Sequence, residues 1–128
     1  MGGFAVYTGS DKSVRVDIPA EFQKLKYRGP DNTIIKDFGD SGWMGFHRLK
    51  IMDVSDDGNQ PMVYENVHLI CNGEVYNYPE LKAQYEDRFA FTSCSDCEVI
   101  IPMFLEKGIK QTAMELDAEF VCVIYDSE

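Results

Sequence analysis

The segment Val67-His68-Leu69-Ile70-Cys71-Asn72-Gly73 decides the fold class, because the patterning of the chain changes on its two sides. Its apolar first part predicts a strand, and Asn72-Gly73 is the strongest short-range signal for a hairpin turn. Loops rich in Asp, Gly, Ser and Asn separate three earlier strand-like segments, at residues 3–7, 33–36 and 45–52. The first half of the chain therefore predicts mainly strands.

Helical spacing dominates after this segment. Apolar residues recur every four positions between residues 81 and 89, behind Pro79, and this spacing predicts a helix. One short amphipathic helix is expected earlier, opening at Pro19 and ending before Gly29.

Two more helices are predicted, over residues 95–105 and 109–116, with Gly108 between them. Ser95 is expected to be the N-cap of the first, and Glu98, three positions later, its capping-box partner.

The chain closes with the continuous apolar run Phe120-Val121-Cys122-Val123-Ile124-Tyr125, which predicts a strand buried on both faces. Strands first, helices in the second half and a final strand indicate an α+β fold. In such a fold, helices pack on mostly antiparallel sheets.

Length and charge limit the classes of function. A chain of 128 residues is large enough for one core, so residues 1–128 are expected to form a single domain. The formal net charge of −10 would repel a phosphate backbone, which argues against nucleic acid as a partner. No apolar run approaches the roughly 20 residues that cross a bilayer, and Val6 stands where a myristoylation motif requires Ser or Thr. We therefore expect a cytoplasmic protein without a membrane partner.

The cysteines and histidines do not predict a metal or redox site. Cys94-Ser95-Asp96-Cys97 has the spacing of such sites, but the sequence has no second pair with ligand spacing. His47 and His68 lie in different strand-like segments, where packing or surface roles are expected. We predict free, mostly buried thiols and no bound metal.

Four motifs, well separated along the chain, together resemble those of one protein family. They are Tyr27-Arg28-Gly29-Pro30-Asp31, Gly45-Phe46-His47-Arg48-Leu49-Lys50-Ile51-Met52-Asp53, Cys71-Asn72-Gly73-Glu74-Val75-Tyr76-Asn77 and Ser95-Asp96-Cys97-Glu98-Val99-Ile100. Their order and spacing are similar to the glutaminase domain of asparagine synthetase, a class II glutamine amidotransferase. The resemblance extends over residues 1–128.

This resemblance implies a fold and a context. Domains of the family are N-terminal-nucleophile hydrolases with two stacked antiparallel sheets between helical layers (αββα), and they release ammonia from glutamine for a synthetase domain. The strands that follow residues 120–126 in the family are absent, so the implied module is shortened or incomplete. The implied partners are glutamine and either a synthetase domain or a larger assembly. ATP and Mg²⁺ would be cofactors of a following synthetase domain, and none is expected within this chain.

The resemblance also assigns the residues of a glutamine pocket. Arg48 would bind the α-carboxylate as a planar fork, a geometry that Lys cannot reproduce. Glu74 and Asp96 would bind the α-ammonium group, and backbone groups of Ile51 and Met52 would line the same pocket. Without this resemblance, Arg48 would be interpreted as a positively charged side chain exposed on a strand.

Hydrolysis would require a nucleophile and donors for the developing oxyanion. By resemblance, Asn72 and Gly73 are those donors, through a side-chain amide and a backbone N–H. Read alone, the same pair predicts only a tight turn. The family's nucleophile is a cysteine that becomes the first residue after methionine removal, and Gly2 occupies that position here. Trimming of Met1 would expose an amine with no sulfur beside it.

Three functions follow as alternatives. The first is a domain that binds glutamine but does not hydrolyse it, whether the loss of the thiol is natural or introduced. The second is a non-catalytic building block that keeps the fold for packing in a larger assembly. The third is an enzyme with another nucleophile, for which Cys71 and Cys97 are candidates. Cys71 is expected to point away from Asn72, because side chains alternate along a strand.

Overall fold

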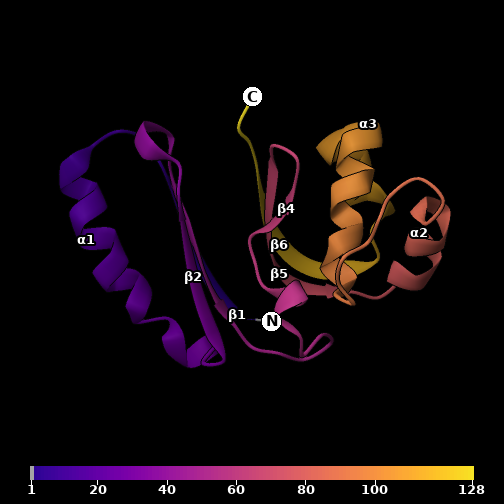
Figure 1. The fold of residues 1–128 in the computed structure, drawn as a ribbon, viewed down its shortest axis with the longest axis horizontal. Helices are drawn as coiled ribbons and strands as arrows, with labels where there is room; N and C mark the ends of the chain where they lie inside the picture. The colour runs from indigo at the N-terminus through magenta and orange to yellow at the C-terminus, as the bar shows by residue number, and fades with distance from the viewer. Residues whose placement is uncertain (1) are drawn as a thin grey trace.

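The computed structural model describes residues 2–128 and arranges them in four layers, helix, sheet, sheet and helices (Figure 1). The first sheet contains β1 (Gly2–Thr8), β2 (Asn32–Asp37) and β3 (Gly42–Arg48), in the order β1-β3-β2 with both pairs antiparallel. It lies between α1 (Lys12–Gln23) on one side and the second sheet on the other. The αββα expectation is therefore confirmed.

The second sheet contains β4 (Met62–Tyr64), β5 (Val67–Val75) and β6 (Ala118–Asp126), again antiparallel, in the order β4-β5-β6. Asn72 and Gly73 lie inside β5, opposite Val121 and Phe120 of β6. The interpretation of this pair as a hairpin turn is wrong, because long-range pairing with β6 outweighs its local turn preference. The three-residue β4 was not predicted.

Helix α1 (Lys12–Gln23) covers the outer face of the first sheet. The prediction that it opens at Pro19 is wrong, since the Asp11 side chain caps the helix by accepting hydrogen bonds from the backbone N–H groups of Ser13 and Val14. The cap at Asp11, rather than Pro19, therefore determines where α1 begins. The 3₁₀ turn η1 (Lys26–Arg28) follows the helix, and η2 (Gly39–Ser41) joins β2 to β3.

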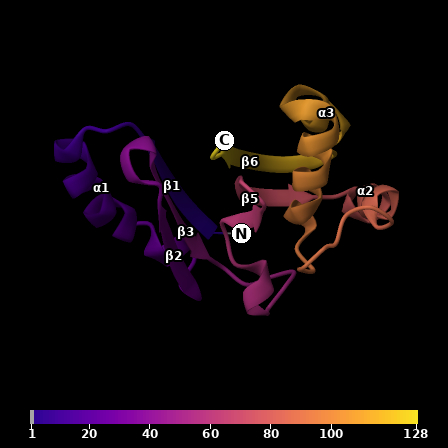
Figure 2. The same ribbon diagram turned by 45° about the horizontal axis from the view of Figure 1, so that its top comes forward.

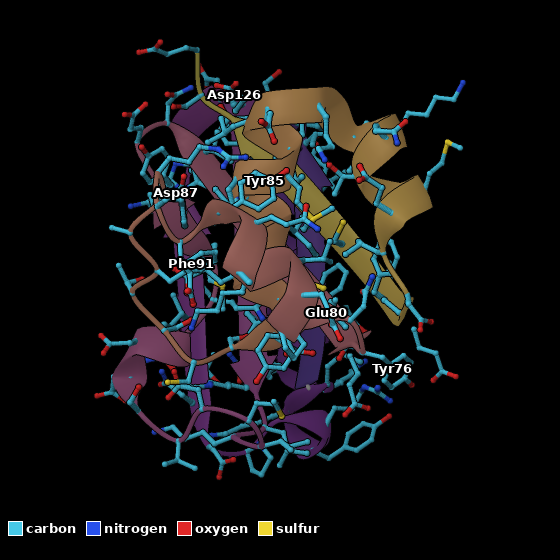
Figure 3. All side chains as sticks on the ribbon, turned by 90° about the vertical axis from the view of Figure 1, so that its right-hand side faces the viewer. Tyr76, Glu80, Tyr85, Asp87, Phe91 and Asp126 are labelled. Carbon is cyan, nitrogen blue, oxygen red and sulfur yellow. The ribbon has the colours of Figure 1, made fainter. Side chains whose placement is uncertain are left out.

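Helix α2 (Tyr78–Tyr85), the 3₁₀ turn η4 (Asp96–Val99) and α3 (Ile100–Glu115) cover the second sheet. Figure 3 looks onto this layer, with the buried Tyr85 near its centre. Gly108 interrupts α3 with a φ of 78°, so the two predicted helices share one element with a break at the predicted residue.

Ser95 caps η4 as expected, through its hydroxyl and the Cys97 N–H. The capping-box role of Glu98 is wrong, because its carboxylate instead accepts hydrogen bonds from the backbone N–H and hydroxyl groups of Thr92 and Ser93.

Two hydrophobic clusters fix the layers. Ile70 packs with Met44 and Phe46 between the sheets. Its neighbour Cys71 points to the opposite face, into the larger cluster that joins the second sheet to α2 and α3. Strand alternation thus lets β5 contribute to both clusters. Figure 2 shows the two sheets from a second direction.

Strand β6 does not have the burial that its apolar sequence predicts. Its residues are half-buried or exposed, and the Val121 side chain is 52% exposed. Within the part of the chain that the structure describes, β6 pairs with β5 alone and forms the edge of its sheet, so burial on both faces is contradicted. None of the helices formed by residues 2–128 has the length and apolar character needed to cross a membrane.

Strand β3 ends at Arg48, four residues before the predicted end. The Arg48 carbonyl accepts a hydrogen bond from the Asp31 N–H at 3.0 Å, and the Asp31 carboxylate accepts one from the Lys50 N–H at 2.8 Å. These bonds turn the chain out of the sheet. Residues 49–55 therefore form a loop beside β5 instead of continuing the strand.

Candidate functional site

An open hollow lies where β3 ends, beside β5 and the entrance of η4. Its cavity volume is about 70 Å³, and the space around it, counted together with the open solvent at its mouth, is about 560 Å³. Six of the predicted site residues line it: Arg48, Ile51, Met52, Gly73, Glu74 and Asp96. We call it the Arg48–Asp96 hollow.

Arg48 brings a buried positive charge to this hollow, with only 5% of the residue exposed. Its Nη1 donates hydrogen bonds to the Asn59 side-chain oxygen at 2.8 Å and to the Ser55 carbonyl oxygen, and its Nη2 donates to the Asp53 carbonyl oxygen. All three acceptors are neutral. A Cβ at Gly58 would lie 2.2 Å from Nη2, so only glycine leaves room for the guanidinium there. The interpretation of Arg48 as an exposed cation is wrong.

Asp53 fixes the loop that surrounds the guanidinium. Its Oδ1 accepts hydrogen bonds from the backbone N–H of Ser55 at 2.8 Å and from the Ser55 hydroxyl at 2.5 Å. Its Oδ2 accepts one from the backbone N–H of Cys94 at 2.7 Å. The hydrogen bond from the Ser55 hydroxyl has the largest effect on the pKa of Asp53, and the one from the Cys94 N–H the next largest. Both hold this pKa below its usual value.

Arg48 and the loop after β3 form one wall of the hollow, and two carboxylates line the wall that β5 and η4 form. Asp96 is buried at the start of η4, and its Oδ2 accepts a hydrogen bond from the Val75 N–H at 2.6 Å. Glu74 precedes Val75 on β5 and is exposed. The hollow is therefore lined by a guanidinium at the end of β3 and by two carboxyl groups from β5 and η4.

Gly2 and Asn72 meet at the edge of this site. The Gly2 N–H donates a hydrogen bond to the Asn72 side-chain oxygen at 3.0 Å, across 70 residues of sequence. Gly2 is also the strand partner of Arg48, and the Arg28 Nε donates to its carbonyl oxygen at 3.3 Å. The side-chain nitrogen of Asn72 has no hydrogen-bond partner among residues 2–128. The predicted site residues thus come together, although Met1 lies outside the described residues.

Backbone atoms crowd the position where a side chain would leave Gly2. A Cβ built there would lie 1.8 Å from the carbonyl oxygen of His47 and 3.3 Å from the Cα of Arg48. Both atoms belong to the main chain of β3, so they cannot swing aside as a flexible side chain would. The backbone at residue 2 is therefore shaped for glycine.

The two candidate thiols, Cys71 and Cys97, line the base of the hollow, and both residues are buried. Cys71 belongs to the core cluster under α3 and points away from Asn72, as predicted. The Cys97 Sγ contacts the Gly73 carbonyl oxygen at 3.9 Å. Hydrogen bonding with Cys71, together with burial, raises the pKa of Cys97 far above its usual value. The Cys97 thiol stays protonated, and a thiol is a much weaker nucleophile than a thiolate.

The remaining sulfur and imidazole groups have packing roles or lie at the surface. All four cysteines are free, with Cys94 exposed and Cys122 half-buried. His47 stacks on Phe22 with ring centroids 3.9 Å apart, and its ring nitrogens contact Thr33 and the Phe22 carbonyl. Within residues 2–128, no group of three His, Cys, Asp or Glu side chains is placed to hold a metal ion.

Three residues of the site were not predicted: Asp53, Asn59 and Gln60. Gln60 is buried, and its side-chain amide makes two hydrogen bonds with the backbone of Cys71, at 2.6 and 2.9 Å. Its contacts join distant segments, which leaves no local pattern in the sequence. Only Asp53 carries a usable signal, because Asp-x-Ser is typical of a side chain that bonds the backbone two residues later.

Comparison with known proteins identifies the family. The family model described as "Glutamine amidotransferase domain" matches residues 1–128. The chain belongs to the glutamine amidotransferase domain family. It is 41% identical over 107 residues to "Probable asparagine synthetase [glutamine-hydrolyzing]" of Acanthamoeba polyphaga mimivirus, covering 80% of this chain and 19% of that protein. It is 38% identical over 130 residues to "Asparagine synthetase, nodule [glutamine-hydrolyzing]" of Pisum sativum, covering 98% of this chain and 22% of the relative.

The amidotransferase domain is thus of asparagine-synthetase type, and it spans about a fifth of the length of these relatives. Its fold matches that of glutamine phosphoribosylpyrophosphate amidotransferase from B. subtilis, with a TM-score of 0.59 and 20% sequence identity. That match covers 96% of this chain and 28% of the solved one. The expected N-terminal-nucleophile hydrolase fold is therefore confirmed.

Proposed function

We propose that this amidotransferase domain binds glutamine in the Arg48–Asp96 hollow and does not hydrolyse it. The observation that carries the proposal is the guanidinium of Arg48, which is buried but contacts only neutral acceptors. Within the described part of the chain, no carboxylate forms an ion pair with it. A buried charge favours an opposite charge nearby, and the carboxylate of an amino acid supplies one.

The remaining groups of the hollow match the rest of an amino acid. The carboxylates of Glu74 and Asp96 would bind the α-ammonium group, and backbone groups at Ile51 and Met52 would line the ligand. The side-chain amide would then extend toward Asn72 and Gly73. This orientation places a cation, anions and neutral donors at the three polar ends of glutamine.

The missing thiol would stop the reaction at binding. Hydrolysis by this route needs a sulfur that attacks the amide carbon, an amine that takes the thiol proton, and donors for the developing oxyanion. Gly2 provides no sulfur, so no thioester forms. Loss of the nucleophile of the protease subtilisin costs on the order of 10⁶-fold in turnover, and we expect a comparable loss here. Binding itself needs no cofactor, and ATP with Mg²⁺ would serve only a synthetase domain.

Calorimetric titration with glutamine, together with an assay for ammonia release, tests this proposal. Charge-assisted contacts contribute about 1.5 to 3 kcal/mol each, so three of them should give a dissociation constant in the millimolar range or tighter. Ammonia release should stay at the level of a blank. Absence of binding would contradict the first half of the proposal. Ammonia release that persists after alkylation of accessible thiols would contradict the second.

A structural or interaction module is the second candidate. The side chains of Ile51, Met52 and Val54 are 54%, 47% and 73% exposed beside the hollow, which favours cover by another domain or subunit. In that case the pocket is vestigial. Titration with glutamine then gives no heat of binding, and a high glutamine concentration does not raise the free energy of unfolding.

A further inference from the structure

The Asp53 carboxylate connects the two walls of the Arg48–Asp96 hollow. Its Oδ1 accepts two hydrogen bonds from Ser55 within its own loop, and its Oδ2 accepts one from the backbone N–H of Cys94, 41 residues away in sequence. Asp53 is buried, with 8% of the residue exposed, so water competes little for these bonds. One side chain therefore links the loop after β3 to the entrance of η4.

Each of these bonds leads directly to a group of the proposed pocket. On one side, the carbonyl oxygens of Asp53 and Ser55 accept the hydrogen bonds from Arg48 Nη2 and Nη1. The Asp53 carboxylate therefore fixes the turn that holds the guanidinium. On the other side, Cys94 stands two residues before Asp96, which lines the wall formed by β5 and η4.

We infer that Asp53 is a positioning residue that sets the separation between Arg48 and Asp96. It thereby selects ligands that carry a carboxylate and an ammonium group on the same carbon atom. This inference rests on the proposed function, because it assigns the two walls to those two groups. Asp53 also lines the hollow, but both oxygens of its carboxylate accept hydrogen bonds from Ser55 or Cys94, so it acts through Arg48 and the segment before Asp96.

The chain contains a matched comparison for Asp53. Asp11 also precedes a serine by two residues, and its Oδ1 accepts hydrogen bonds from the Ser13 N–H at 2.9 Å and the Ser13 hydroxyl at 2.7 Å. Asp11 is exposed at the start of α1, outside the hollow. The two aspartates share the two bonds from their serines, but Asp11 also accepts a long one from the Val14 N–H at 3.5 Å and has no counterpart of the bond from Cys94. Asp53→Asn and Asp11→Asn make the same chemical change. Only Asp53→Asn affects a bond between distant segments of the chain.

Residue-resolved amide hydrogen exchange without ligand tests the link itself. Asp53→Asn leaves one side-chain oxygen, which keeps more bonds when it faces Ser55, so the amide nitrogen faces the Cys94 N–H and that bond is lost. The Cys94 amide should exchange at least about tenfold faster than in the unsubstituted chain, by the usual energy of a hydrogen bond to a charged group. Asp11→Asn should leave exchange at Cys94 unchanged. Unchanged exchange at Cys94 in Asp53→Asn would overturn the inference.

A pair of ligands tests the selectivity. Glutamine and 4-aminobutanamide share the amide and the amine, but the second lacks the α-carboxylate that Arg48 would bind. The unsubstituted chain should prefer glutamine by at least about tenfold, and Asp53→Asn should lose most of this preference. Asp11→Asn should keep it. Equal weakening for both ligands would show general loosening of the fold and overturn the inference.

The outcomes separate the inference from the function on which it rests. If the unsubstituted chain does not bind glutamine, the proposed function fails. If it binds glutamine and Asp53→Asn keeps the full preference, the inference alone fails. Ser55→Ala decides the matter if Asp53→Asn does not fold, because it removes only the hydroxyl partner of Asp53. It should reduce the preference in the same direction by a smaller factor, and an unchanged preference would count against the inference.

Discussion

At the scale of single residues, the planar shape of Arg48 matters as much as its charge. Its two terminal nitrogens contact two backbone carbonyls and one amide oxygen while the side chain lines the hollow. A lysine ammonium is a single point and cannot reproduce this fork. The geometry of the loop over residues 53–59 therefore depends on a guanidinium at position 48.

Arg48→Lys should weaken glutamine binding at least about tenfold, because one or more hydrogen bonds to a charged group are lost. Calorimetric titration measures the change. Arg88→Lys is the matched control, because Arg88 is half-exposed and contacts Gln84, Asp87 and Glu106 on the outer helical layer. Equal affinities in Arg48→Lys and the control would remove the reason for placing a carboxylate at Arg48.

Acid should weaken the fold through Asp53. A carboxyl group whose pKa is lower in the folded state stabilises the fold above its unfolded-state value, about 3.9. That contribution disappears as pH falls through the folded-state pKa. The difference in unfolding free energy between the unsubstituted chain and Asp53→Asn should therefore be constant between about pH 5 and 7 and shrink below about pH 4.

Urea denaturation at a series of pH values measures this difference. Asp57→Asn controls for the change in net charge, because Asp57 is exposed in the 3₁₀ turn η3 (Asp56–Gly58). A difference for Asp53→Asn that stayed the same down to pH 3 would contradict the assigned role of its ionised form.

Sequence motifs predict some residues of the hollow, and others can be identified only from the structure. Arg48, Glu74 and Asp96 stand inside recognisable motifs, and the structure brings all three to one hollow. Asp53 and Gln60 hold that hollow together through bonds to Cys94 and Cys71. Such bonds depend on which loops meet in space, and a single sequence carries no periodic signal for that.

At the scale of elements, Gly73 of β5 lies close against the backbone of β6. A Cβ at this position would lie 2.2 Å from the Glu119 carbonyl oxygen and 2.5 Å from the Cα of Phe120. Both atoms belong to the backbone of β6, so any side chain at Gly73 has to push the strands apart.

Gly73→Ala should destabilise the domain by roughly 1 to 3 kcal/mol, the usual cost of overpacking. It should also weaken glutamine binding, because Gly73 lines the hollow. Gly3→Ala is the control, since a Cβ there meets its nearest neighbours at 3.4 Å, an ordinary contact. Chemical denaturation of both variants measures the difference, and equal stability would contradict the close approach of β5 and β6.

The errors of element prediction have physical causes that differ from case to case. The start of α1 is set by the cap at Asp11, a signal that Pro19 obscures. Strand β4 escapes prediction because three residues are too few for a periodic pattern. The burial of β6 is overestimated, since an apolar run indicates a strand but not whether that strand lies at the edge of its sheet. The break of α3 at Gly108 is predictable, because glycine is a local signal.

At the scale of the whole molecule, the hollow lies between the layers rather than within one of them. Its guanidinium comes from the first sheet, while Gly73 and Glu74 come from the second, and Asp96 from the turn before α3. A ligand in the hollow would therefore contact both halves of the fold at once. Binding should stabilise the domain as a unit rather than one loop.

L-Glutamine at 100 times its dissociation constant should raise the free energy of unfolding by about 2.7 kcal/mol. D-Glutamine at the same concentration should give a much smaller rise, because it cannot present its carboxylate, ammonium and amide groups to Arg48, Asp96 and Asn72 together. Urea denaturation with each enantiomer measures both values. Equal stabilisation by the two would indicate non-specific binding and contradict the three-point arrangement.

The crowding around Gly2 has a consequence for any substitution at this position. Because the atoms that fill the space of its missing side chain belong to the main chain of β3, they cannot adapt by changing a rotamer. A single mutation to cysteine would meet a backbone that has already closed over the vacant position. A sulfur at residue 2 would therefore require the first strand to shift as well as the side chain to change.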